Sequence, residues 1–156
     1  MKTKLSQKIV TAARSWLGTR YHHQGRLKKT SKHKGGVDCV GLVMGVVAEL
    51  NITGAGGKNL IELDRTDYSA HPDGRSLVEF LDMHLQKTNL KKIKDGDILL
   101  FKLFKHPQHV GIATLGKIRG LGVIHCYSAS GSVVEHILSP AWLRMIVGVY
   151  RFKLDK

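Results

Sequence analysis

The spacing of apolar residues changes near Lys94, and this change limits the folds open to the chain. Before Lys94, apolar residues recur at the spacing of helices; after it, short apolar runs are separated by tight turns. Helices followed by a series of short strands are typical of an α+β fold with an antiparallel sheet. A chain of 156 residues can bury a substantial core, and we expect residues 1–156 to form a single domain.

Three helices are predicted before the change in spacing, at about residues 6–17, 38–50 and 76–87. Ser6 is placed to cap the first helix, and Gly18 to end it. Ser76 and Glu79 form the Ser-x-x-Glu pattern of a capping box at the start of the third helix. Residues 51–74 show little periodicity and contain several glycines, so we expect a long surface connection there.

Five strands are predicted after Lys94, at residues 98–103, 109–115, 123–128, 132–138 and 145–153. The glycine-rich segment 116–122 is expected to form the hairpin loop between the second and third strands. Trp142 falls in the short link before the last strand, and we expect its side chain to be at least half-buried.

Cys39 lies where a glycine-containing loop gives way to the second predicted helix. Asp38 is placed to cap this helix, which puts Cys39 in the first turn. Unpaired backbone N–H groups and the positive end of the helix dipole favour a thiolate over a thiol there. A thiolate is the nucleophile of cysteine chemistry, but a free cysteine is more often a small buried residue, and position alone leaves both interpretations open.

Two histidines could serve Cys39 as a base and as the residue that orients the base. His109 begins one predicted strand and His125 lies in the next, so a hairpin would bring them onto neighbouring strands. Gly111 and Ala113 share a sheet face with His109, and their small size leaves room there for a packed helix or a substrate. A helix packed on this face is one way to bring Cys39 to the histidines.

The other cysteine and the other histidines are expected to have structural or solvated roles. Side chains alternate across a strand, so Cys126 points away from the face that carries His125. If His125 belongs to the site, Cys126 is therefore the structural cysteine. His136 is expected to be solvated or locally hydrogen-bonded.

Together, these residues predict a mechanism of acyl transfer. Cys39 attacks a carbonyl carbon, while His109 holds the thiolate as an ion pair and later protonates the leaving amine. His125 hydrogen-bonds the other ring nitrogen of His109 and fixes its tautomer. The backbone N–H of Cys39, at the helix start, helps to stabilise the oxyanion.

The composition argues against several classes of protein. Two cysteines without a CxxC pattern exclude a disulfide scaffold, and nine histidines without an HExxH pattern predict no metal site. No apolar run is long enough to span a bilayer. The N-terminal segment is basic but lacks the apolar core and cleavage site of a secretory signal, so we expect synthesis in the cytoplasm and delivery by another route.

The net charge of +13 predicts attraction to a polyanion, such as nucleic acid, an anionic membrane or an anionic cell-wall polymer. Much of this charge lies in residues 26–34 and in Lys91, Lys92 and Lys94, which we expect to be solvated loops. The sequence has no helix-turn-helix pattern and no stripe of mixed aromatic and basic residues, so no specific nucleic-acid partner is expected.

Five ordered segments resemble the NlpC-type cell-wall cysteine peptidases, over about residues 8–152. They are LGTRY (17–21), DCVGLV (38–43), DGDILLF (95–101), HVGIA (109–113) and VIHCY (123–127). The resemblance implies a papain-like α+β fold, with N-terminal helices packed on a five- to six-stranded antiparallel sheet and the nucleophile at a helix N-terminus. YHHQ at 21–24 and VVEHILSPAW at 133–142 resemble the phage and prophage tail branch, which includes gene-transfer-agent proteins.

The resemblance implies a catalytic triad of Cys39, His109 and His125. It places Tyr21 beside the nucleophile, as a contributor to the oxyanion site, and gives Asp38 a structural or substrate-amine role. The implied substrates are peptidoglycan stem peptides, typically cut between D-glutamate and a diamino acid. No metal and no organic cofactor is implied.

Two positions depart from the family pattern beside these residues. Val40 follows the cysteine where many members have a serine close to the substrate. His22 begins the segment that replaces the usual Trp-Gly-Gly, directly after Tyr21. We expect Val40 and His22 to be candidate substrate-binding residues.

Two alternatives to a peptidoglycan peptidase stay open at this point. One is the same fold and nucleophile acting as a thioesterase, acyltransferase or amide hydrolase on another substrate. The other is a non-enzymatic basic module of a phage. The resemblance also makes phage tail or assembly proteins expected partners, and a location on the virion tail with action on the cell wall the expected localisation.

Overall fold

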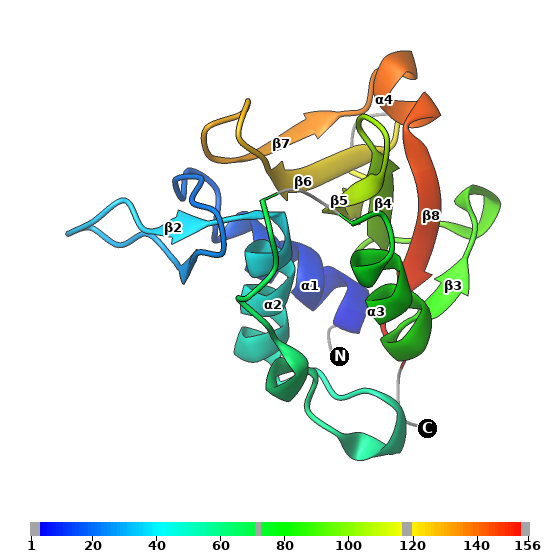
Figure 1. Cartoon of the computed structure of the whole chain (residues 1–156), viewed down its shortest axis with the longest axis horizontal. Coiled ribbons are helices and arrows are strands. Elements are labelled where there is room, and N and C mark those ends of the chain that lie inside the picture. Colours follow the sequence, from blue (N-terminus) through cyan, green and yellow to red (C-terminus); the bar gives the residue numbers. More distant parts are fainter. Residues whose placement is uncertain (1–3, 71–72, 117–119, 154–156) are drawn as a thin grey trace.

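Six antiparallel strands form the main sheet of the molecule, in the order β3-β8-β4-β5-β6-β7 (Figure 1). The structure is a computed structural model, and it describes residues 4–70, 73–116 and 120–153. The strands are β3 (Gln86–Thr88), β4 (Ile98–Lys102), β5 (Pro107–Thr114), β6 (Gly122–Cys126), β7 (Val133–Ile137) and β8 (Ile146–Arg151). The predicted α+β fold with an antiparallel sheet is confirmed.

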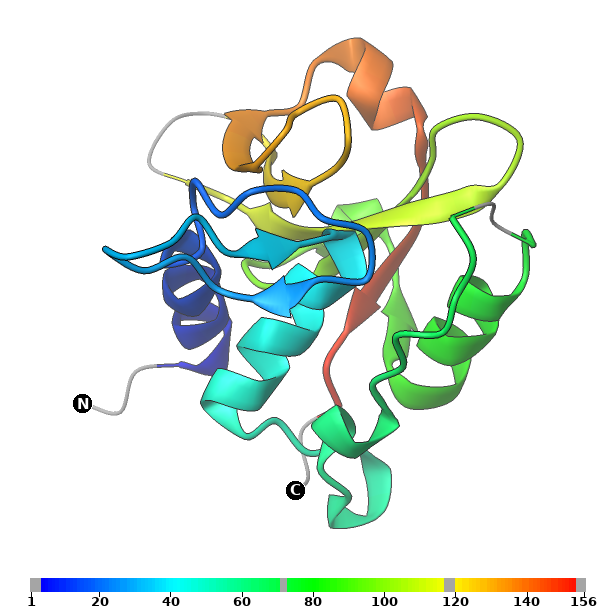
Figure 2. The ribbon, with the colours of Figure 1, turned by 60° about the vertical axis from the view of Figure 1, so that its left-hand side comes forward.

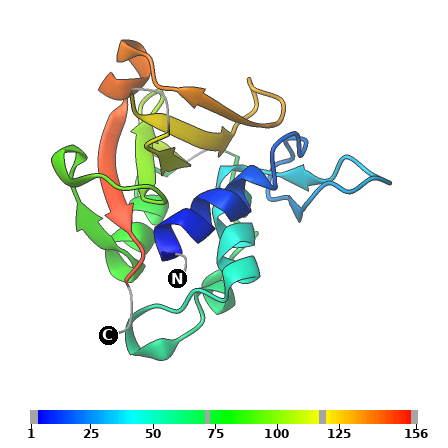
Figure 3. The ribbon, with the colours of Figure 1, turned by 180° about the vertical axis from the view of Figure 1, so that it is seen from behind.

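Four α-helices accompany the sheet within the described residues: α1 (Leu5–Arg14), α2 (Cys39–Leu50), α3 (Ser76–His84) and α4 (Pro140–Arg144). Seen from behind, α1 crosses α2 on one side of the sheet (Figure 3). A two-stranded hairpin, β1 (Arg26–Leu27) with β2 (Gly36–Val37), lies over the N-terminal end of α2 (Figure 2). No helix in the described part of the chain is long and apolar enough to cross a membrane.

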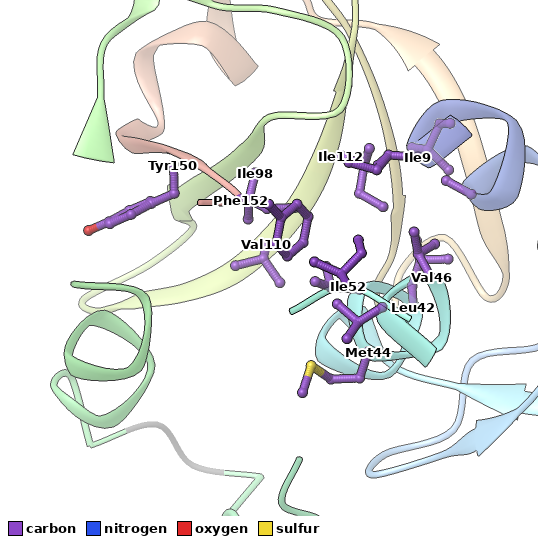
Figure 4. Packing of buried hydrophobic residues seen from close by; sticks show 14 of the residues in the cluster. Ile9, Leu42, Met44, Val46, Ile52, Ile98, Val110, Ile112, Tyr150 and Phe152 are labelled. Atoms are coloured by element: carbon purple, nitrogen blue, oxygen red, sulfur yellow. The ribbon is translucent and has the colours of Figure 1, made fainter. Parts of the chain in front are cut away.

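The main core lies between α1, α2 and one face of the sheet. Leu42 and Val46 of α2 are fully buried, and they belong to the same apolar cluster as Val110, Ile112 and other strand residues (Figure 4). Apolar residues spaced by three and four positions place one stripe of α2 against the sheet. The predicted second helix, with Asp38 as its cap and Leu50 as its last residue, is confirmed.

The opposite face of the sheet carries a smaller apolar cluster, which Trp142 of α4 helps to cover. Ala113 belongs to this smaller cluster, whereas Val110 and Ile112 belong to the main core with α2. The expectation that a helix carrying the cysteine packs on the face of His109 and Ala113 is therefore wrong. Strand alternation predicts which residues share a face, but the larger apolar residues on the other face are those that α2 buries.

The structure also corrects the predicted helix ends. Ser6 does not cap α1, because the N-cap is Lys4 and makes no side-chain capping bond, and the helix ends at Arg14, before the turn to Gly18. The predicted capping box is absent, since Ser76 is itself the first residue of α3. The carboxylate of Asp73 accepts hydrogen bonds from the Arg75 and Ser76 N–H groups instead, each at 2.9 Å.

Several short elements differ from the prediction. The third helix was expected to reach Lys87, but it ends at His84 and residues 86–88 form edge strand β3. The link that contains Trp142 is helix α4, capped by the Ser139 hydroxyl. The connection 51–74 contains two 3₁₀ turns, η1 (Ala55–Gly57) and η2 (Leu60–Leu63), and a third turn, η3 (Leu90–Lys92), precedes β4. In the predicted hairpin loop 116–122, residues 117–119 lie outside the described residues.

Gly45 lets the ring of Trp16 lie directly against α2. A Cβ atom at Gly45 would overlap the six-membered ring of Trp16, whose side chain is buried. Alanine in a helix interior is normally more stable than glycine by about 1 kcal/mol. Here we expect Gly45→Ala to lower the free energy of unfolding by about 1–3 kcal/mol, because overpacking outweighs helix propensity.

Urea unfolding followed by circular dichroism measures this effect. Gly116→Ala is the matched control, since a Cβ atom there meets no atom within 4 Å. A Gly45→Ala protein as stable as the native chain would show that Trp16 is not packed tightly on α2.

Candidate active site

Cys39 is the first residue of α2, and the loop that precedes it holds the helix start in place. The N-cap is Asp38, whose Oδ1 accepts a hydrogen bond from the Gly41 N–H at 2.7 Å. This geometry leaves the N–H groups of the first turn directed at the cysteine. The N–H groups of Cys39 and Val40 both stabilise the thiolate.

The sulfur of Cys39 lies where β5 separates from β6. These strands pair only through Ile112–Thr114 and Gly122–Ile124. The Ala113 N–H donates a hydrogen bond to the Asp97 carbonyl oxygen, on the β4 side of β5. Because N–H directions alternate along a strand, the Val110 N–H points the opposite way, toward β6. Beyond the end of the pairing, the Val110 N–H hydrogen-bonds to Cys39. The sulfur thus contacts β5 at Val110, the residue next to His109.

His109 and His125 are both buried, and a hydrogen bond of 2.8 Å joins His109 Nε2 to His125 Nδ1. They are diagonal neighbours on one face, because the β5–β6 register, continued one residue beyond the pairing, puts Gly111 opposite His125. A Cβ atom at Gly111 would overlap Val123 and lie 3.1 Å from His125 Cβ, so glycine is required for this pairing. The two histidines that the sequence singled out are therefore in direct contact.

A third histidine extends this pair. His125 Nε2 lies 2.8 Å from His136 Nε2 on the edge strand β7, and His136 Nδ1 lies 3.0 Å from the carbonyl oxygen of Ile137. The expectation that His136 is solvated or only locally hydrogen-bonded is wrong. The signal that could have found it is the β6–β7 register, which puts Val134 opposite His125 and so places His136 diagonally on the same face.

Trp142 covers the three histidines. Its ring centroid lies 5.0 Å from that of His125, 5.6 Å from that of His136 and 6.4 Å from that of His109. Phe101 packs against both Trp142 and His109, with centroid distances of 5.4 and 5.6 Å. Apolar rings around hydrogen-bonded imidazoles keep water away from those bonds and make each bond stronger electrostatically.

Burial decides the charge state of this site. It lowers the pKa of His109 to about 3, with a smaller contribution from His125, and it lowers the pKa of His125 to about 3, with a smaller contribution from His136. Burial also raises the pKa of the Cys39 thiol to about 12, and the negative charge of Asp38 adds to this effect. Burial and Asp38 therefore oppose the predicted preference for a thiolate, whereas the backbone N–H groups favour it.

Asp38 is saturated by hydrogen bonds from the protein itself. Besides the cap, it accepts bonds from the Gln24 N–H at 2.8 Å, from Arg26 Nη1 at 3.2 Å and from the Tyr68 hydroxyl. Arg26 also binds both carboxylate oxygens of Asp64, at 2.9 and 3.0 Å. Of the two roles open to Asp38, this geometry favours the structural one.

The sequence prediction missed Arg26 and Tyr68. Arg26 was counted among the solvated basic residues, and Tyr68 lies in the connection expected to be structureless. Burial is the first cause that raises the pKa of the Tyr68 hydroxyl, and its bond to Asp38 is the second, so this hydroxyl stays a donor. No local pattern pairs residues so far apart in the chain.

The other candidate residues surround the cysteine. Tyr21 is half-buried, and its pKa is raised by burial first and then by the negative charges of Asp38 and Cys39. Val40 is half-buried against the main core. His22 is exposed, and its Nδ1 lies 2.9 Å from the His23 carbonyl.

Cys126 lies on the main-core side of the sheet, as expected. It is fully buried, and its thiol donates a hydrogen bond to Val37 O at 3.3 Å. Among residues 4–70, 73–116 and 120–153, no three His, Cys, Asp or Glu side chains are arranged to hold a metal ion.

A cysteine at a helix N-terminus beside paired histidines on an antiparallel sheet defines a cysteine hydrolase of the papain-like kind. The model of the NlpC/P60 family matches residues 18–151, and the chain belongs to this family. Its members are cysteine peptidases and amidases that act on peptidoglycan, so the protein is an enzyme of this class.

Solved structures share the fold at low sequence identity. The NlpC/p60 domain of the peptidoglycan hydrolase SagA is 19% identical with a TM-score of 0.57, over 96% of this chain and 100% of that one. An N-acetylmuramoyl-L-alanine amidase from Bacteroides uniformis is 16% identical with a TM-score of 0.56, over 96% and 99%. An NlpC/P60 family protein from Bacillus cereus is 19% identical with a TM-score of 0.62, over 97% and 41%. No curated protein matched the chain.

The buried neutral histidines make stability depend on pH. In the unfolded chain both take up protons below about pH 6.5, whereas the folded protein holds His109 and His125 neutral down to about pH 3. The unfolded state therefore gains protons first, and the free energy of unfolding falls as the pH falls below 6.5. Each histidine is expected to contribute about 2 kcal/mol to the loss between pH 7.5 and 5.

Urea unfolding at pH 7.5 and at pH 5 measures this loss. His125→Gln removes one titrating group, so its loss on acidification is expected to be smaller than that of the native protein by about 2 kcal/mol. Equal stability of the native protein at the two pH values would contradict the neutral histidine pair.

Proposed function

We propose that the protein is a cysteine endopeptidase or amidase that hydrolyses peptidoglycan stem peptides with Cys39, His109 and His125. The observation that carries the proposal is the 2.8 Å bond between His109 and His125, made beside a cysteine that the Val110 N–H anchors at the start of α2. It supplies a nucleophile, a base and a residue that orients the base in one place.

The proposed reaction starts from the neutral thiol of Cys39 and the neutral imidazole of His109. As Sγ of Cys39 attacks the carbonyl carbon of the scissile amide, its proton passes to Nδ1 of His109, the ring nitrogen that His125 leaves free. Proton transfer from Cys39 to His109 creates the negative and the positive charge together, so neither charge is buried without its partner. The imidazolium then gives its proton to the leaving amine, and a water activated by His109 hydrolyses the thioester and regenerates the thiol.

The oxyanion of the tetrahedral intermediate needs donors at the start of α2. The backbone N–H of Cys39 is one donor, and the Tyr21 hydroxyl, whose raised pKa keeps its proton in place, is the other. His22 and Val40 flank this position and are proposed to contact the substrate. Valine offers no hydroxyl, so an apolar contact replaces the serine contact at this point.

The proposed scissile bond lies between D-glutamate and the diamino acid. The family and the description of SagA as a peptidoglycan hydrolase support a stem-peptide substrate. The amidase from Bacteroides uniformis indicates the competing choice, the bond to L-alanine. Each carboxylate oxygen of Asp38 already accepts two hydrogen bonds from the protein, so Asp38 is not proposed to bind a substrate amine.

We further propose that the enzyme works with phage tail or assembly proteins and acts on the wall from the virion. The segments at 21–24 and 133–142, with their resemblance to the tail branch, support this origin. The net charge of +13 supports attraction to an anionic wall polymer.

Digestion of purified sacculi tests the reaction. The native protein is expected to release new amino groups, and mass spectrometry of the fragments identifies whether the amine belongs to a diamino acid or to L-alanine. Cys39→Ala is expected to release none, because the attacking sulfur is gone. Cys126→Ala, which removes the structural thiol, is the matched control and is expected to stay active. Equal release by native protein and Cys39→Ala would end the peptidase proposal.

The two histidines are expected to differ in their effect on turnover. His109→Ala removes the base, and we expect kcat to fall by about 10³-fold or more. His125→Ala removes only the orienting contact, and we expect a smaller loss, of about 10- to 100-fold. Initial rates on a soluble stem peptide measure both. Native activity in His125→Ala would show that another residue orients His109.

A further inference from the structure

His136 has no task in the proposed mechanism, yet it ends a continuous row of imidazoles. The row starts at His109 on β5, crosses His125 on β6 and reaches His136 on the edge strand β7, with 2.8 Å at each step. Each step is a diagonal across neighbouring strands on one sheet face. At its far end lies a group of fixed polarity, the carbonyl oxygen of Ile137, 3.0 Å from His136 Nδ1.

This carbonyl determines where every proton in the row resides. A carbonyl oxygen only accepts, so Nδ1 of His136 must carry the proton that bonds to Ile137. In neutral His136, Nε2 is then bare and accepts from Nε2–H of His125. Neutral His125 is left with a bare Nδ1, which accepts from Nε2–H of His109. Nδ1 of His109 is consequently bare as well.

We infer that His136 is a positioning residue that, from the Ile137 carbonyl, fixes the tautomers of His125 and His109 so that Nδ1 of His109 stays free to accept a proton. The inference rests on the proposed function, in which Nδ1 of His109 takes the proton of Cys39. His125 alone could not impose this choice, because a neutral imidazole serves equally as donor or acceptor through either nitrogen. The row needs an end of fixed polarity, and His136 connects it to one.

The surroundings of His136 suit this role. Trp142 packs over it with a centroid distance of 5.6 Å and also covers His125, which shields the bond between them from water. Its neighbour Glu135 does not compete for the imidazole, because that carboxylate binds the Arg14 guanidinium at 2.8 Å. Of the two ring nitrogens of His136, one bonds to the row and the other to the backbone.

Nitrogen NMR of the full chain labelled with ¹⁵N-histidine tests the tautomers directly, without substrate. In the native protein at pH 7.5, we expect Nδ1–H in His136 and Nε2–H in both His125 and His109. In His136→Met, which offers no acceptor of comparable strength, the tautomers of His125 and His109 are expected to become mixed. An Nδ1–H form of His109 as the main species in the native protein would overturn the inference.

Kinetics separates positioning from a structural role. We expect His136→Met to lower kcat about tenfold with little change in KM, as is typical of lost outer contacts. His136→Gln, whose Oε1 can accept from His125, is expected to restore most of kcat. Glu135→Gln, on the same strand, is the matched control and is expected to keep the native kcat. A native kcat in His136→Met, or the same loss in Met and Gln variants, would overturn the inference.

The two proposals fail in different ways. If the native protein releases no amines from sacculi but its histidines show the expected tautomers, the proposed function fails while the order of the row stands. If the native protein is active but His109 carries its proton on Nδ1, the function stands and the role of His136 fails. Should His136→Met not fold, the tautomers of the native protein and the kcat of His136→Gln decide the matter.

Discussion

The end of the β5–β6 pairing at Ile112 is the feature on which the proposed site depends. Helix α2 packs on one face of the sheet and the histidines lie on the other, and Cys39, the first residue of α2, meets the sheet at Val110, next to His109. Pairing between the two strands stops at Ile112, and the Val110 N–H, which would otherwise bond to a strand, bonds to the sulfur. The end of the pairing thus leaves the Val110 N–H free to act as the donor that anchors the proposed nucleophile.

Burial strengthens the hydrogen bonds of this site, and it also makes the charged forms of its residues costly. Water-free surroundings strengthen the His109–His125 bond, but they also disfavour a lone thiolate or a lone imidazolium. The fixed anion next to the cysteine, Asp38, adds to the cost of a thiolate, and its ion pair with Arg26 reduces that effect. Arg26 and Tyr68 therefore matter to the chemistry without being close to the substrate carbonyl, because they hold and partly neutralise a charge that faces the sulfur.

Sequence reasoning succeeded where local patterns decide the structure. The periodicity of α2, its Asp38 cap and the alternation in the long strands are set by neighbouring residues, and they placed Cys39, His109 and His125 on the correct elements. Sequence reasoning failed where a residue's contacts come from segments far away in the chain. Strand β3 exists only because β8 pairs with it, and residues 86–88 have no strand pattern of their own. The face that α2 covers depends on competition between two apolar surfaces, and the contact of His136 depends on a hairpin register that composition does not determine.

The arginines and the lysines of the chain have different roles. Within the described residues, the cations of the ion pairs are Arg14, Arg26, Arg65, Arg151 and Lys28, so arginines make most of the specific contacts. A planar guanidinium binds a carboxylate through two parallel bonds, as Arg26 does with Asp64, whereas an ammonium is a hydrated point charge. The net charge of +13 is therefore carried mainly by exposed lysines such as Lys32 and Lys91. Such charges attract a polyanion over roughly a Debye length of 10 Å without fixing its orientation.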